Sequence, residues 1–167
     1  MRYALVMLIL PIFLLGGCGQ ETSTSSSHSG KPASIEGSVF DDNGEVKQAT
    51  IEALDKNENR LVSTRLDPQG HFKIKIPSTA KYPVILRAKL KDGKVLEAVL
   101  INDQVVEQDI SPFTDLVVKS ARLNGGLTPE NITIAAGAAI NMRRSQGGKR
   151  SSSGFKGDLT KQYGGWH

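Results

Sequence analysis

Short runs in which apolar and polar residues alternate dominate the middle of the chain. The runs lie at residues 35–39, 49–53, 72–76, 86–90 and 96–100. A period of two over runs this short is typical of half-buried β-strands. In the run 72–76, we therefore predict that Phe72 faces a core and that Lys73 faces solvent.

Turn signals separate these runs. Asp67-Pro68-Gln69-Gly70 has proline second and glycine fourth, as a type I turn prefers, and Asp92-Gly93 is typical of a two-residue hairpin loop. Short strands joined by regular turns predict a mainly β fold, a seven-stranded antiparallel β-sandwich over residues 34–111.

One or two short helices are predicted over residues 112–141. Pro112 ends strand pairing, Thr114 can cap a helix that has Asp115 in its first turn, and Gly125 ends that helix. Its apolar side would consist of Val117, Val118, Ala121 and Leu123.

A second helix is predicted to start with Thr128 as N-cap and Pro129 at its first position. Its apolar positions fall on one face at a spacing of 3.6 residues. They are Ile132, Ala136, Ala139 and Ile140.

The start of the chain has the layout of a secretory signal peptide. Arg2 supplies a positive charge, residues 3–15 form an uncharged, mostly apolar run, and two glycines follow. The run is shorter than the roughly 20 residues that a membrane-spanning helix needs. We therefore expect residues 1–17 to be removed, with cleavage between Gly17 and Cys18.

The residues at this point, Leu15-Gly16-Gly17-Cys18, resemble the lipobox of bacterial lipoproteins. The resemblance implies that the Cys18 thiol carries a diacylglycerol and that the new amino group is acylated, for example with palmitate. Cys18 would then hold the protein to a membrane. The alternatives are an ordinary signal peptide and an inert buried thiol. Gly19 is not Asp, the residue that often signals inner-membrane retention in such lipoproteins, which favours the outer membrane, with the protein facing the periplasm or the cell surface.

Residues 18–33 are rich in serine and contain no large apolar side chain. Such a segment cannot offset its ordering entropy by burial, so we predict a flexible, disordered linker. Its mean reach would be about 20 Å. His28 lies in it and is interpreted as a solvated side chain.

Glycines and apolar positions in residues 34–110 form a recognisable pattern. The pattern is Ile35-x-Gly37-x-Val39, Asp42-x-Gly44, Ala49-x-Ile51-x-Ala53 and Thr64-x-x-Asp67-x-x-Gly70-x-Phe72. It resembles the carboxypeptidase regulatory-like domains, which are transthyretin-like or Cna-B-like sandwiches of bacterial surface proteins. Ser111-Pro112-Phe113-Thr114 is similar to a segment that often follows such domains. The resemblance implies a fold and no chemistry.

The last segment, residues 142–167, is basic and rich in glycine and serine. Counted from Asn141, it has six basic residues against one acid, a net charge of +5. One interpretation is a solvated, disordered tail. The other is a docking segment for an envelope protein or an anionic glycan or lipid, with nucleic acid excluded by the compartment. The docking candidates are Arg143, Arg144, Lys149 and Arg150.

The residues that carry catalysis do not form a recognisable pattern. No Gly-x-Ser-x-Gly elbow or phosphate-binding loop is present, and no histidine has metal-ligand spacing. Asp41, Asp42 and Asn43 would suit a weak calcium site, but an Asx-rich turn is the favoured interpretation. We predict no enzyme, no cofactor and no metal.

Two functions from different classes remain open. The first is a lipid-anchored envelope protein whose β-sandwich serves as a binding or structural module. The alternative is an accessory subunit of a secretion, pilus or polysaccharide-export assembly, docked through the basic C-terminal segment.

Overall fold

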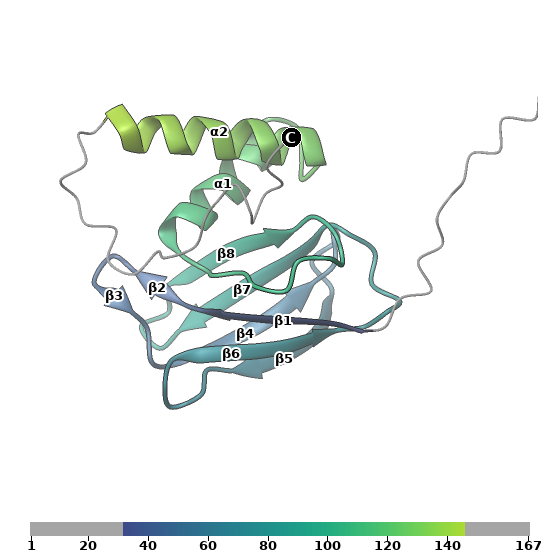
Figure 1. Ribbon diagram of the computed structural model, residues 1–167, viewed down its shortest axis with the longest axis vertical. Coiled ribbons are helices and arrows are strands. Elements are labelled where there is room, and N and C mark those ends of the chain that lie inside the picture. Colours follow the sequence, from purple (N-terminus) through teal and green to yellow (C-terminus); the bar gives the residue numbers. More distant parts are fainter. Residues whose placement is uncertain (1–31, 146–167) are drawn as a thin grey trace, which may run out of the picture.

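A computed structural model describes residues 32–145 of the chain, with side chains as far as Met142 (Figure 1). Eight strands and two helices follow one another within these residues. They are β1 (Ala33–Ser38), β2 (Phe40–Asp41), β3 (Gly44–Glu45), β4 (Ala49–Leu54), β5 (Arg60–Arg65), β6 (His71–Ile76), β7 (Val84–Leu90), β8 (Val95–Leu100), α1 (Pro112–Leu123) and α2 (Pro129–Ser145).

The predicted mainly β fold with antiparallel strand pairing is confirmed, but the predicted set of seven strands is wrong. The described strands form three small sheets, which are β1-β6, β2-β3 and β5-β4-β7-β8. The extra strands β2 and β3 have two residues each and form a separate hairpin. A segment around residues 105–110 runs parallel to β1 and joins it through isolated bridges at Glu36–Glu107 and Val39–Ile110.

The main core lies between the β1-β6 pair and the four-stranded sheet. Ile35 and Ile74 from the pair share one buried cluster with Ile51 and Leu86 from the larger sheet. On β6, buried and exposed residues alternate strictly, as predicted, and Phe72 is only 3 % exposed. This alternation fixes which face of β6 is packed against the core.

The turn predicted at Asp67–Gly70 is present, whereas the hairpin loop predicted at Asp92-Gly93 is longer than two residues, because the Leu90 N–H donates to the Lys94 carbonyl at 2.9 Å. The Gly70 N–H donates to the Asp67 carbonyl at 3.0 Å, and Gly70 has a φ of 91°, which favours glycine. Asp92-Gly93 joins β7 to β8, and Gly93 has a φ of 87°. The turn chemistry therefore sets the pairing of these strands.

The two helices form further layers on the outer face of β8 (Figure 1). α1 packs on β8, and α2 packs on α1 as the outermost layer. Val99 of β8 shares a second buried cluster with Val117 and Val118 of α1 and with Ile132 of α2. Strand β8 is therefore covered on both sides. Within residues 32–145, neither helix is long and apolar enough to cross a membrane.

The start of α1 differs from the prediction in its cap. Ser111, not Thr114, is the N-cap, because Pro112 already occupies the first helical position. Thr114 is the third helical residue and closes a capping box with Ser111. Leu123, predicted on the apolar side, is exposed at the end of the helix.

The start of α2 is as predicted, and its end is not. The Asn131 N–H donates to Thr128 Oγ1 at 3.2 Å, and Pro129 is the first helical residue. The helix continues to Ser145, past the expected end at residue 141. Its backbone therefore includes Arg143 and Arg144, which were predicted to belong to the basic tail.

Replacing Phe72 by alanine should cost about 3–5 kcal/mol of unfolding free energy, because it removes a buried ring between two β layers. Lys73→Ala is the matched control, since Lys73 is exposed and its ion pair with Glu36 lies at the surface. Urea unfolding of both variants measures the difference. Equal midpoints would contradict the observed register of β6.

Candidate functional site

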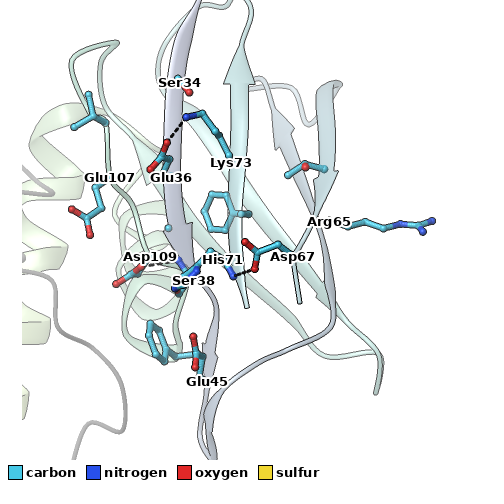
Figure 2. Close-up of a pocket in the computed structure, with 15 residues that line it drawn as sticks. Ser34, Glu36, Ser38, Glu45, Arg65, Asp67, His71, Lys73, Glu107 and Asp109 are labelled. Atoms are coloured by element: carbon cyan, nitrogen blue, oxygen red, sulfur yellow. Dashed lines mark hydrogen bonds and ion pairs between the residues drawn. The ribbon is translucent and has the colours of Figure 1, made fainter. Parts of the chain in front are cut away.

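An open groove crosses β1 and β6 and has a volume of about 1230 Å³ (Figure 2). Residues 106–109 border it on one side, and the end of β5 and the following turn border it on the other. Most of its lining side chains are polar. They include Ser34, Glu36, Ser38, Glu45, Arg65, Asp67, His71, Lys73, Glu107 and Asp109.

One wall of the groove depends on a glycine. A Cβ atom at Gly37 would lie 2.1 Å from the carbonyl oxygen of Gln108, so no larger residue fits there. Across this contact, the Gln108 N–H donates to the Glu36 carbonyl at 2.8 Å and the Glu36 N–H donates to the Val106 carbonyl at 3.0 Å. Gly37 thus lets residues 106–109 lie close beside β1.

Asp109 is the buried acid of the groove. Its Oδ1 accepts the Ser38 N–H at 2.9 Å. Burial raises the pKa of the Asp109 carboxyl, and the charge of Glu107 raises it further, whereas the Ser38 N–H and His71 act in the opposite direction. The carboxyl therefore holds its proton to a higher pH than an exposed aspartate does.

Two other groove acids, Glu36 and Asp67, have partners within the fold. Figure 2 shows Glu36 facing Lys73, with which it forms an ion pair. Asp67 accepts the backbone N–H groups of His71 and Gln69, each at 2.9 Å, and these bonds lower the pKa of its carboxyl. These acids shape the groove and the turn that borders it. The lining of the groove is acidic, because it contains five carboxylates against one lysine and one arginine.

A second charged cluster connects α1 to the larger sheet. Glu97 of β8, only 4 % exposed, lies 2.7 Å from Arg87 of β7 and forms an ion pair with Arg122 of α1. Glu58 contacts the same two arginines, at 3.0 Å and 3.2 Å. The four side chains form a closed ring of ion pairs at the edge of the helix layer.

The cap of α1 adds a buried contact to the same strand. Thr114 Oγ1 donates to the Glu97 carbonyl at 2.9 Å, and it also accepts the Ser111 N–H at 2.9 Å. The Ser111-Pro112-Phe113-Thr114 segment therefore both starts the helix and attaches it to β8. Its role in the fold is structural.

The candidate calcium ligands have other contacts. Asp41 Oδ1 accepts the Asn43 N–H at 2.7 Å, which is the Asx turn favoured from sequence. Asp42 forms an ion pair with Lys94 at 2.5 Å. In the part of the chain that the structure describes, no group of three acidic, histidine or cysteine side chains is placed to hold a metal ion.

None of the sequence-predicted site residues has a side chain among those that the structure describes. Gly17, Cys18, Lys149 and Arg150 lie outside residues 32–145, and Arg143 and Arg144 are described only as helix backbone. The groove and the ring of ion pairs were missed, because both depend on the positions of segments distant in sequence. No protein-family model and no curated protein matches this chain.

Glu97→Gln should lower the unfolding free energy by about 2–3 kcal/mol, because it leaves two arginines facing a neutral partner at a buried position. Glu58→Gln is the matched control and should cost less than about 1 kcal/mol, since Glu58 is half exposed. Thermal unfolding compares them. A larger loss for the Glu58 variant would contradict the importance of burial at Glu97.

Asp109→Asn should shift the dependence of stability on pH, so that the variant gains stability relative to wild type as pH rises. A carboxyl with a raised pKa in the folded state binds its proton more tightly there than in the unfolded chain, so the contribution of Asp109 to wild-type stability falls as pH rises through the window above 3.8. The asparagine variant keeps an oxygen acceptor for the Ser38 N–H and lacks this loss. Urea titrations at pH 4 and pH 7 test it, and an unchanged pH slope would contradict the raised pKa.

Proposed function

We propose that this chain is a bacterial lipoprotein in which lipidated Cys18 tethers a non-enzymatic β-sandwich to a membrane of the cell envelope. The observation that carries the proposal is Leu15-Gly16-Gly17-Cys18 at the end of a short apolar run that follows Arg2. In a cell with two membranes, Gly19 favours the outer one. The sandwich serves there as a binding or structural module.

The arrangement of the strands supports the sandwich interpretation. The β1-β6 pair and the four-stranded sheet bury their facing side chains in one cluster, as two layers of a sandwich do. The positions that resemble carboxypeptidase regulatory-like domains also have structural roles. Gly37 permits a close backbone approach, Gly44 and Gly70 have positive φ, and Phe72 is buried.

The groove supports recognition rather than catalysis. Glu36 pairs with Lys73, Asp67 accepts turn amides and Asp109 accepts the Ser38 N–H, so these acids organise a surface. An acidic lining favours a partner that brings positive charge or hydrogen-bond donors. An anionic partner would instead suit the basic residues from Arg143 onward.

Cys18→Ser should abolish lipid attachment and leave the precursor uncleaved, because a serine hydroxyl is far less nucleophilic than a thiolate. The measurement is the intact mass of the membrane-extracted protein. Wild type should begin at Cys18 with the added mass of diacylglycerol and acyl chains, and the variant should retain residues 1–17.

Ser27→Ala, a change in the same serine-rich segment, is the control and should be processed like wild type. A wild-type protein that begins at another residue, or that carries no lipid, would refute the proposed anchor.

A further inference from the structure

The outward face of α2 carries exposed apolar side chains, and Glu130 in the first turn is the charged residue on this face among the described side chains. Ile132, Ala135 and Ala139 are buried against α1, and the opposite side of the helix is exposed. On that side, Ile134 is 61 % exposed and Met142 is 46 % exposed. Exposed Ala138 lies between them at a spacing of four residues, so the three share one line along the helix.

This face differs from an ordinary water-exposed helix face. Residues 131–142 contain no charged side chain, although exposed positions on helices usually carry charges. Gly137 also lies on the exposed side, where a Cβ atom would meet nothing within 4 Å. Glycine inside a helix costs about 1 kcal/mol relative to alanine, and packing within the described fold does not require it.

We infer that this face of α2, defined by Ile134, Ala138 and Met142, lies on the surface of the bilayer to which Cys18 is anchored. The inference rests on the proposed lipoprotein function and adds an orientation to it. A helix that lies in the membrane interface presents apolar side chains to the acyl chains and has basic residues nearby for anionic headgroups. Here Arg143 and Arg144 end the helix, and Lys149 and Arg150 follow.

The charge of the chain selects an anionic lipid surface as the occupant. The residues after Met142 are strongly basic, and each cation near an anionic leaflet contributes about 1 kcal/mol of binding. An identical α2 from a second copy ends in the same basic residues and so offers no opposite charge to them. Charge complementarity therefore favours phospholipid such as phosphatidylglycerol over a second copy.

The tether is long enough for this arrangement. Fifteen residues lead from Cys18 to Ala33 at the start of β1, and they can span at most about 50 Å. The layers from the β1-β6 pair to the axis of α2 add up to about 30 Å, at roughly 10 Å per packed layer. The lipid anchor and α2 can therefore reach the same bilayer, and tethering makes the second contact intramolecular.

The arrangement would also orient the groove. α2 and the β1-β6 pair lie on opposite sides of the four-stranded sheet (Figure 1). With α2 on the lipid, the groove across β1 and β6 would face away from the membrane. The same contact would thus hold the domain in place and present its polar groove to partners in the envelope.

Tryptophan quenching by brominated lipid tests the contact in the full lipidated protein. In a Trp166→Phe background, which removes the single native tryptophan, Ile134→Trp places a probe on α2. Val106→Trp is the matched control, since Val106 is 71 % exposed beside β1. In vesicles of brominated phosphatidylglycerol at high dilution of protein in lipid, the Ile134→Trp probe should be quenched at least threefold more than the control.

The outcomes separate this inference from the proposed function. A lipidated protein whose two probes are quenched alike, or whose Val106→Trp probe is quenched more, would overturn the contact alone. If the Ile134→Trp probe is shielded from solvent only at high protein density, the face contacts a second copy of the chain. That result would also overturn the inferred membrane contact. An intact mass without lipid would refute the anchor and this inference together.

Discussion

The attachment of α1 to strand β8 determines how the whole molecule is layered. Leu96 and Leu100 of β8 face the core between the β layers, while Glu97 and Val99 face the helices. Thr114 reaches the Glu97 carbonyl from the helix cap, and Arg122 reaches the Glu97 side chain from the last turn. Because α2 packs on α1, its position as the outermost layer depends on these two contacts with Glu97 together with the buried cluster of Val99, Val117 and Val118.

Local patterns predicted the parts of the fold that local forces decide. Alternation gave the buried side of β6, and proline and glycine gave the turns at Asp67–Gly70 and Asp92–Gly93. Strand β5 has no such alternation, since Leu61 and Val62 are neighbours and both are only half buried at a sheet edge. Its pairing with β4 comes from tertiary contacts, which a pattern of period two does not record.

The candidate surfaces were harder to predict for the same reason. The groove forms only because residues 106–109 lie beside β1, although the two segments are about 70 residues apart in sequence. Gly37, which permits this close approach, is the one local sign of it in the sequence. Glu97 sits at an outward strand position and would be exposed if α1 did not cover it. Serine and threonine both cap helices, so residue type alone does not distinguish Ser111 from Thr114 as the cap of α1. In the structure Pro112 is the first helical residue, which makes Ser111 the cap.

Charged residues are distributed unevenly between the described domain and the segments outside it. Basic and acidic residues balance within residues 32–145, so the net charge of +4 comes from the segments outside them. The groove across β1 and β6 is acidic, and the chain after Met142 is basic. This division matches a domain that turns its basic end toward anionic lipid and its acidic groove toward the envelope.

The most direct measurement of this orientation is neutron reflectometry of the lipidated protein on a supported bilayer that contains phosphatidylglycerol. If α2 lies on the lipid, protein density should begin at the headgroups, with no solvent layer between them and the domain. A solvent-rich gap of about 20 Å, the mean reach of the serine-rich segment, would show a domain held only by its tether and would contradict the account.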